Sequence, residues 1–394
     1  MGGSFSVFDI VIIVGIIQGI VAAIVISSYP SESAGKKILS AILVTLVLLN
    51  FKILLHTLGL WKFPVLHYLP LAIDTLIQPL IYLYICSLTQ KEYRFNRKNL
   101  WHFLPVFLFQ SHAVLVYIFT LFKPDILIKD VFAERYFFYN NFKWVEDLAA
   151  IISAVIYWIL SLKKILAYRH WLFTSQSATQ YSELTWLRNL LIVTGILAAA
   201  LTISSIPANI FQLKNSFLYL QLFYCYLTML IYYLSFQGYK TILTTEVHMV
   251  RFPEAIISEP AELIESVNTI NKPSTNIQDF SDIKLALTEV MEKQMLFMEP
   301  ELSLKELAGK INFPTAQVSA AINAEFGINF RSWVNSYRVE EVKKRLGNPK
   351  YEHLSLTGIA FDCGFNSEAS FYRIFRQQTG YSPKSYLQLI HRKH

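Results

Sequence analysis

The sequence predicts an all-α protein in which a seven-helix transmembrane bundle is followed by a smaller polar domain with two helix-turn-helix units. Two observations lead to this prediction. Hydrophobic residues make up 54% of the chain and charged residues only 16%, which is too apolar for a soluble protein. The charged residues also gather after about Thr241, so we expect the apolar and polar parts to form separate domains.

Seven apolar segments approach the ~20 residues that a helix needs to cross a bilayer. The first of them is not a cleavable secretory signal, because residues 1–6 carry no cationic flank and many apolar segments follow. We therefore expect residues 1–241 to form a transmembrane domain. The seven segments are residues 9–27, 38–60, 69–89, 100–122, 144–166, 188–210 and 215–239.

The distribution of Lys and Arg predicts the orientation of this bundle, because cytoplasmic loops carry an excess of these residues. The loops after the first, third and fifth segments carry Lys36, Lys37, Lys91, Arg94, Arg97, Lys98, Lys163, Lys164, Arg169 and Arg188. The loops after the second, fourth and sixth carry Lys62, Lys123, Lys129, Arg135, Lys143 and Lys214. The first set is expected in the cytoplasm. The chain would then be a multi-pass protein of the cytoplasmic (inner) membrane, with its N-terminus outside and its C-terminal domain inside.

Residues 242–280 are predicted to form an acidic cytoplasmic linker, because prolines and glutamates are frequent there and no helical periodicity is sustained. Apolar residues then recur at helical spacing after Ser281. We expect a helix over about 282–298 to open a third domain, residues 281–394.

The second helix-turn-helix unit is the most specific motif of the chain. A short helix ends at Asp362, Gly364 supplies the turn, and Asn366 or Ser367 can cap the next helix. In that helix the apolar face consists of Phe371, Ile374 and Phe375. The start and the opposite face of the helix present Glu368, Ala369, Tyr372, Arg373 and Arg376. These residues are the candidates to contact DNA: Arg373 can reach guanine O6 and N7, and Arg376 a phosphate.

The first unit spans residues 302–327 and has a less polar reading surface. Its two helices are expected to pack through Leu304, Leu307, Ala308, Val318, Ala321 and Ile322. The outward residues include Thr315, Gln317, Ser319 and Asn323, beside Ala316 and Ala320. Because this face carries no cation, we expect it to read bases less strongly than the second unit.

Between the units, residues 330–346 are predicted to form a longer helix that fixes their spacing. Its cations, among them Arg331 and Arg338, are expected to reach DNA phosphates. Basic residues outnumber acidic ones from Pro300 to the C-terminus, which favours attraction to a nucleic acid.

Residues 281–388 resemble the C-terminal DNA-binding domain of AraC/XylS-type bacterial transcription regulators. The resemblance rests on Asn335-Ser336-Tyr337-Arg338-Val339, Ile359-Ala360, Cys363-Gly364-Phe365, Phe371, Arg373, Phe375, Gly380, Pro383 and Tyr386. It implies seven helices, two recognition helices that meet successive major-groove segments, and activation as the commoner output. It covers little over a quarter of the chain. The family often has larger or charged residues where Ala316 and Ala320 stand, and no soluble effector domain is visible here.

Polar residues inside the apolar segments form the second candidate site, because such residues are expensive in a membrane and often functional. With the predicted orientation, five of them lie toward the outer half of the bundle, and His112 lies nearer the middle. Their shared depth predicts a sensor pocket open to the outside. The alternative is interhelical hydrogen bonding or an interfacial position, above all for the carboxylates. The five are His56, Asp74, Glu146, Asp147 and Asn209.

No pattern predicts an enzyme, a metal or a cofactor. The three cysteines lack metal-ligand spacing, and the HExxH and GxxxxGK motifs are absent. The last apolar segment, 215–239, contains no lysine for a retinal Schiff base, which excludes a retinal receptor.

We therefore expect a membrane-bound, sequence-specific transcription regulator that couples a membrane or extracytoplasmic signal to gene expression. Its expected partners are double-stranded DNA, RNA polymerase, the lipid bilayer and an unknown small-molecule or membrane signal, and a homodimer is left open. One alternative is a receptor whose DNA-binding domain is released by proteolysis. The other is a transporter in which the DNA-binding domain is a secondary reporter.

Overall fold

The computed structural model describes residues 6–30, 33–90, 93–178, 183–210, 216–243 and 280–391, without the side chains of 201–210, 216–219, 241–243 and 391. Every regular element in these ranges is a helix, so the all-α prediction is confirmed. The chain divides into two compact units. The first consists mainly of residues 1–165 and 186–246, and the second of residues 166–185 and 254–394. The predicted linker, 242–280, lies almost wholly outside the described residues.

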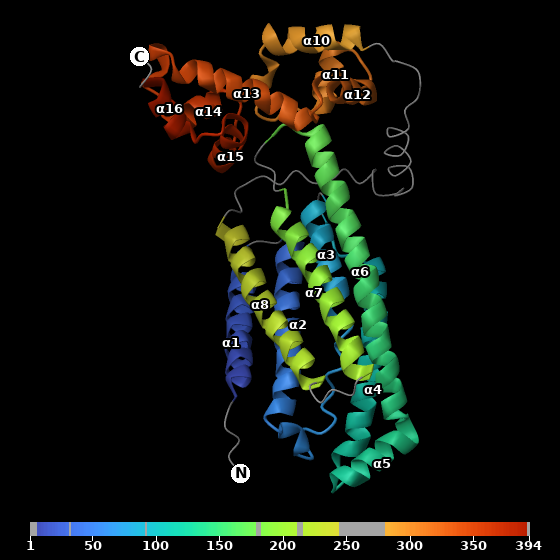
Figure 1. The fold of residues 1–394 in the computed structure, drawn as a ribbon. Coiled ribbons are helices and arrows are strands. Elements are labelled where there is room, and N and C mark those ends of the chain that lie inside the picture. The colour runs from blue at the N-terminus through green and yellow to red at the C-terminus, as the bar shows by residue number, and fades with distance from the viewer. Residues whose placement is uncertain are drawn as a thin grey trace. The chain divides into compact units, whose positions relative to one another are not determined.

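Each of the seven predicted apolar segments overlaps a helix of the bundle, although the segment 69–89 is helical only over Ile77–Thr89 (Figure 1). These helices are α1 (Val7–Ser28), α2 (Ala34–Thr57), α3 (Ile77–Thr89), α4 (Leu104–Leu121), α6 (Tyr139–Ser175), α7 (Thr185–Ile210) and α8 (Ser216–Leu243). Four helical stretches of the described chain, α1, α2, α6 and the stretch Arg97–Leu121 that contains α4, are long and apolar enough to cross a membrane. The number of seven spans therefore stays a prediction.

Two features of the bundle differ from the expectation. The stretch after α4, predicted to be a loop, contains a further helix, α5 (Ile126–Phe137). Helix α6 is also longer than the apolar segment 144–166, because its polar C-terminal residues continue the helix to Ser175. At a rise of 1.5 Å per residue it is about 55 Å long, whereas the hydrocarbon core of a bilayer is ~30 Å thick. Hydropathy finds only the apolar part of such a helix.

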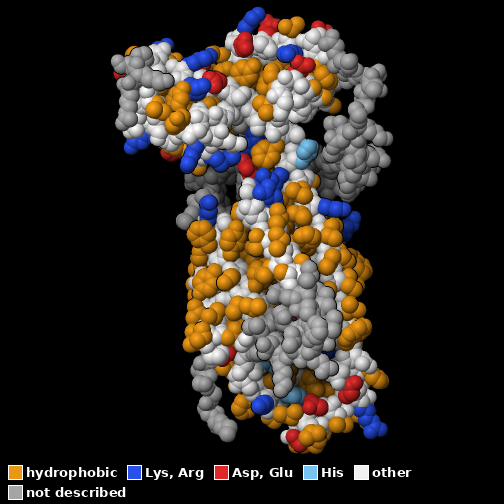
Figure 2. Space-filling model, viewed as in Figure 1, with side chains coloured by type: hydrophobic (Ala, Val, Ile, Leu, Met, Phe, Trp, Pro, Cys, Tyr) orange, Lys and Arg blue, Asp and Glu red, His pale blue; other side chains and the backbone are white. Residues whose placement is uncertain are grey.

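Small residues let α1 pack closely against its neighbours α2 and α8. A Cβ on Gly15 would lie 2.5 Å from the side chain of Thr228 in α8, and a Cβ on Gly19 would lie 2.5 Å from Val47 in α2. This GxxxG spacing is typical of helix contacts in membranes. The outward side of α1 is apolar as well, with exposed residues such as Ile17 and Ile24. Figure 2 shows the same apolar surface over the middle of the bundle and charged side chains toward its ends.

The second unit contains the C-terminal helices. They are α10 (Ser281–Glu292), α11 (Leu304–Ile311), α12 (Thr315–Phe326), α13 (Phe330–Leu346), α14 (Leu356–Asp362), α15 (Glu368–Thr379) and α16 (Pro383–His391). The prediction of one helix over 282–298 is wrong. The chain leaves α10 at Glu292, takes a left-handed conformation at Met295 (φ 50°), and forms a 3-10 turn that buries Leu296 and Phe297 in the core.

Helix α13 joins two apolar cores. Its first half contributes Phe330, Trp333 and Val334 to the core around α10, α11 and α12. Its second half contributes Val339 and Val342 to the core around α14 and α15. The two helix-turn-helix units are therefore fixed to one rigid element, as the sequence predicts.

Candidate functional site

The second recognition helix, α15, presents the predicted reading face to the surface. Phe371, Ile374 and Phe375 are buried in the core with α13 and α14. The N-terminus is capped by Ser367, whose side chain accepts a hydrogen bond from the amide of Ser370. The opposite residues Glu368, Ala369, Arg373 and Arg376 are exposed, and Tyr372 is half-buried. The arrangement can offer two guanidinium groups to a DNA groove.

The turn before α15 requires glycine. Gly364 has φ +92°, a conformation that side chains rarely adopt. A Cβ at this position would also lie 2.6 Å from the carbonyl oxygen of Phe297 and 2.9 Å from Nε of Arg338. The turn is therefore packed against the α13 helix, which sets the direction of α15.

The first helix-turn-helix unit has the predicted core and a smaller reading surface. Ser303 and Glu306 form a capping box at the start of α11, and its Leu304, Leu307 and Ala308 are buried with Val318, Ala321 and Ile322 of α12. On α12, Thr315 and Asn323 are exposed, whereas Gln317 and Ser319 are half-buried. No Lys or Arg occurs in α12. Base contacts by any residue of either unit stay a prediction.

The structure contradicts the expectation that Arg338 reaches DNA phosphates. Its side chain is 0% exposed. Nε donates to the carbonyl oxygen of Phe297 at 2.7 Å, and Nη2 donates to that of Glu299 at 2.7 Å. Nη1 donates to Oδ1 of Asn335 at 3.1 Å. Burial lowers the pKa of this guanidinium to about 9. Arg338 therefore holds the domain together, and it lies too deep to contact DNA.

Residues 166–185 belong to the second compact unit, where they contact the helix-turn-helix domain. Ser177 is buried, and its amide and hydroxyl both donate to the carbonyl oxygen of Leu302, at 3.1 and 2.6 Å. Arg338 in turn donates to the carbonyl and hydroxyl oxygens of Ser177. Glu183 Oε1 lies 2.7 Å from Nη2 of Arg373. Sequence reasoning missed these contacts, because nothing in a short polar loop indicates what it packs against.

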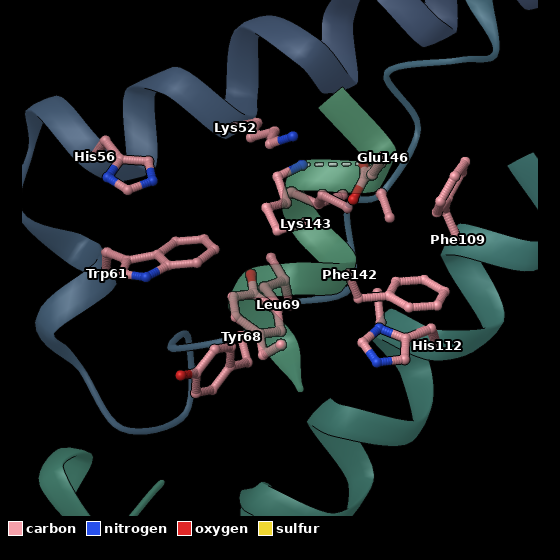
Figure 3. A pocket seen from close by; sticks show the side chains of 14 residues that line it. Lys52, His56, Trp61, Tyr68, Leu69, Phe109, His112, Phe142, Lys143 and Glu146 are labelled. Carbon is pink, nitrogen blue, oxygen red and sulfur yellow. Dashed lines mark ion pairs between the residues drawn. The ribbon is translucent and has the colours of Figure 1, made fainter. Parts of the chain in front are cut away.

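The helical bundle contains a small pocket with a volume of about 100 Å³. Its walls come from α2, α4, α6 and the chain around residue 70, and aromatic rings form much of them (Figure 3). His56 stacks on Trp61 with ring centroids 4.7 Å apart, and His112 stacks on Phe142 at 3.7 Å. The lining residues are Lys52, His56, Trp61, Tyr68, Leu69, Leu71, Ala72, Phe109, His112, Ala113, Tyr139, Phe142, Lys143 and Glu146.

Two lysines organise the carboxylates at this pocket. Lys52 Nζ lies 2.6 Å from Oδ2 of Asp74. Lys143 Nζ lies 3.6 Å from the same Asp74 oxygen, 3.0 Å from Oε1 of Glu146 and 3.3 Å from Oδ1 of Asp147. The cluster joins α2, α6 and the segment before α3 in one network of opposite charges. A charged or polar solute that entered the pocket would compete for these ion pairs.

The predicted sensor residues therefore divide into three groups. His56 and Glu146 line the pocket. Asp74 and Asp147 do not line it but belong to its ion-pair network, Asp147 with a side chain that is 61% exposed. The side chain of Asn209 lies outside the described residues. Sequence reasoning missed Lys52 and Lys143, although a lysine within an apolar segment, as Lys52 is, was the available signal.

The part of the chain that the structure describes contains no group of three or more His, Cys, Asp or Glu residues able to hold a metal ion.

Comparison with known proteins agrees with the C-terminal geometry. The family described as Helix-turn-helix domain matches residues 307–389. An uncharacterized HTH-type transcriptional regulator of Staphylococcus aureus (strain MSSA476) is 31% identical over 100 residues, which are 25% of this chain and only 13% of that protein. The HTH-type transcriptional activator RhaS of Mannheimia succiniciproducens is 26% identical over 142 residues, covering 31% of this chain and 52% of RhaS.

A solved protein of unknown function from Listeria innocua is 30% identical, with a TM-score of 0.24, and the match covers 27% of this chain and 95% of that one. All of these matches are partial, and the chain spans 13% of the length of the Staphylococcus aureus relative. The family match lies within the C-terminal helices and does not extend to the bundle. The C-terminal part of the chain carries a helix-turn-helix domain similar to those of bacterial transcription regulators.

Proposed function

We propose that the protein is a membrane-bound regulator of transcription that binds specific DNA sequences through its C-terminal domain. The observation that carries the proposal is α15, a capped helix with an apolar face buried in the core and Arg373 and Arg376 exposed on the other face. Relatives named as HTH-type transcriptional regulators support it as well.

The bundle would anchor the regulator in the cytoplasmic membrane. Four helical stretches with the length and apolarity of membrane spans, and an apolar outer surface on α1, support this part of the proposal. The Lys and Arg bias favours an external N-terminus and a cytoplasmic C-terminal domain. In this orientation all seven apolar helices would cross the bilayer.

The pocket would be the sensor site. A small polar or charged molecule from the outer side would exchange contacts with Lys52, Lys143 and Glu146, and would thereby favour one packing of α2 against α6. Such a ligand changes the output only if it binds the two packings with different affinity. Helix α6 carries pocket residues at its start and residues of the second unit at its end. This gives a direct covalent route for the signal.

Recruitment of RNA polymerase and pairing of two copies on DNA are further parts of the proposal, as is the absence of enzymatic activity.

Two other functions have specific support. The polar residues in the bundle suit a transporter, and the chain between the two units could be cut to release a soluble regulator.

Mapping of bound DNA across the genome, combined with immunoblots of membrane and soluble fractions against the C-terminus, tests the proposal. Full-length protein in the membrane fraction and discrete promoter peaks are expected. A short soluble fragment at the same promoters would favour proteolytic release. Absence of discrete peaks in inducing and non-inducing conditions would contradict the regulator function.

A further inference from the structure

We propose that the segment 166–185 competes with DNA within the same chain. Its Glu183 forms an ion pair with Arg373, the residue expected to read a base. This inference rests on the proposed DNA-binding function. The segment lies in the same compact unit as the helix-turn-helix domain, so the contact is internal to that unit. The group that pairs with Arg373 is known, because Glu183 belongs to the same chain.

The ion pair involves the residue best placed to read a base. Glu183 Oε1 lies 2.7 Å from Nη2 of Arg373 and accepts a hydrogen bond from it. Arginine uses the same donors to bind guanine or phosphate oxygens. A guanidinium paired in this way offers fewer donors to DNA, and the carboxylate adds a negative charge where DNA phosphates would approach. DNA and Glu183 therefore compete for one group.

A second arginine lies near the same carboxylate oxygen of Glu183. Arg331 is only 3% exposed, and its guanidinium lies 5.5 Å from the ring centroid of Phe173 and 3.9 Å from Glu183 Oε1. Neither Nη1 nor Nη2 has a hydrogen-bond partner among the described residues. A buried guanidinium with open donors is costly. DNA phosphate oxygens could satisfy these donors once the segment has moved away.

Hydrogen bonds that do not use the carboxylate of Glu183 fix its backbone within the segment and bind the segment to the helix-turn-helix domain. Arg169 Nη1 donates to the carbonyl oxygen of Glu183 at 2.6 Å and to Oγ1 of Thr185 at 2.7 Å. Ser177 is bound to Leu302 and to Arg338. Glu183→Gln therefore removes the competing charge and leaves the backbone contacts intact. Arg169→Gln removes the two hydrogen bonds within the segment that fix the backbone of Glu183 and the side chain of Thr185.

Residues 166–175 of this segment are the C-terminal end of helix α6. A change in α6 would therefore alter the contact between Glu183 and Arg373. In this mechanism the unliganded regulator has low affinity for DNA, and the signal removes the competitor.

The test measures binding of the full-length protein, in nanodiscs of neutral phosphatidylcholine, to a fluorescent 40-base-pair duplex of mixed sequence. If Arg373 is freed to neutralise one more phosphate, the slope of log K against log[salt] becomes steeper by about 0.9. At 0.1 M salt this corresponds to about eightfold tighter binding. We expect this gain for Glu183→Gln. The matched control is Glu352→Gln, an exposed carboxylate of the same domain, which should change the affinity little.

Two further variants separate competition from a general effect of charge. Loss of a cation ordinarily weakens DNA binding. Arg169→Gln is nevertheless expected to strengthen it, because the backbone of Glu183 is no longer fixed beside Arg373. In an Arg373→Ala background the gain from Glu183→Gln should shrink, since the two residues act on each other.

Several results would overturn the inference. One is equal affinity of wild type, Glu183→Gln and Glu352→Gln. Others are an undiminished gain in the Arg373→Ala background, or weaker binding by Arg169→Gln. If no variant binds the duplex at any salt concentration, the proposed function fails and the inference falls with it. If all variants bind alike, only the inference fails.

Discussion

The carbonyl oxygen of Phe297 accepts a hydrogen bond of 2.7 Å from Nε of Arg338, and the same oxygen would lie 2.6 Å from a Cβ at Gly364. The buried arginine and the glycine turn thus meet at one point. The first comes from α13 and the second from the turn between α14 and α15. The turn before the second recognition helix is therefore in direct contact with the buried side chain of α13.

Gly364→Ala should destabilise the C-terminal domain. The positive φ alone should cost roughly 1–3 kcal/mol, and the close approach to Phe297 adds to it. Urea unfolding of a soluble fragment of residues 278–394, followed by circular dichroism, measures the effect. Gly309→Ala is the control, because Gly309 lies in α11 with no atom within 4 Å of a built Cβ. This second change should stabilise by roughly 0.5–1 kcal/mol. Equal effects of the two substitutions would contradict the explanation.

The thiol of Cys363 should be inert in the folded protein. The residue is fully buried, and burial raises the pKa of its thiol to about 12, because a thiolate is poorly solvated there. Iodoacetamide at pH 8 should label Cys363 only after urea is added, as measured by mass spectrometry. Rapid labelling of native protein would show that this core opens readily.

The same pKa shift makes the domain less stable in alkali. Above pH ~8.5 the unfolded chain loses the thiol proton, whereas the folded chain keeps it until pH is near its higher pKa. The contribution is therefore complete below pH ~8.5 and is lost as pH rises toward 12. Cys363→Ala should remove this part of the pH dependence. Parallel curves for the two proteins between pH 8 and pH 10 would argue against it.

Much of the fold could be predicted from the sequence, because helix periodicity is local. The packed faces of α11, α12 and α15 follow directly from the 3.6-residue repeat. The burial of Arg338 could not be predicted in this way, since its five hydrogen bonds go to four residues, three of which, Ser177, Phe297 and Glu299, lie far from α13 in the sequence. A basic residue in a helix next to other cations has the same local pattern whether it faces a solvent or a core.

The pocket was predictable only in part. His56, Asp74 and Glu146 carry the signal of polar residues in apolar segments, and the structure brings them together through Lys52 and Lys143. The aromatic stacks in its walls depend on which helices are neighbours, which periodicity does not reveal. The same limit applies to Glu183, whose partner Arg373 is 190 residues away.

The orientation of the bundle can be tested separately from its function. Reporter fusions after Lys98 and Lys240 should have cytoplasmic activity, and a fusion after Asp130 should have external activity, because Lys and Arg are retained in the cytoplasm. An external signal at Lys240 would place the helix-turn-helix domain away from DNA and would exclude the regulator function.

Asp74→Asn should change the response to the signal. Asp74 balances Lys52 and Lys143, so its neutralisation leaves two lysines competing for Glu146 and Asp147. The measurement is expression of a target promoter across inducing conditions, at equal protein abundance. Asp147→Asn is the control, since its side chain is mostly exposed and should matter less. Neither residue lies in the fragment 278–394, so the DNA affinity of that fragment is the same for both variants. An unaltered response would leave Asp74 a structural contact only.

The two reading helices should contribute unequally to sequence recognition. Arg373 is exposed in the middle of α15 and precedes Arg376, so Arg373→Ala in the fragment 278–394 should cost roughly 1–3 kcal/mol of binding free energy and relax the preference at one guanine. Arg376→Ala should weaken binding to all sequences alike and lower the salt-dependence slope by roughly one, as expected of a phosphate contact.

In the first unit, Asn323→Ala and Gln317→Ala should cost less than Arg373→Ala, because α12 carries no cation and offers only amide, hydroxyl and small apolar contacts. Titrations of operator and scrambled duplexes at several salt concentrations separate loss of specificity from loss of general affinity. The fragment lacks Glu183, so the competitor cannot mask the contribution of Arg373. A greater loss of specificity from the α12 substitutions would show that the first unit is the dominant reader, and that the guanidinium of Arg373 serves the phosphate backbone instead.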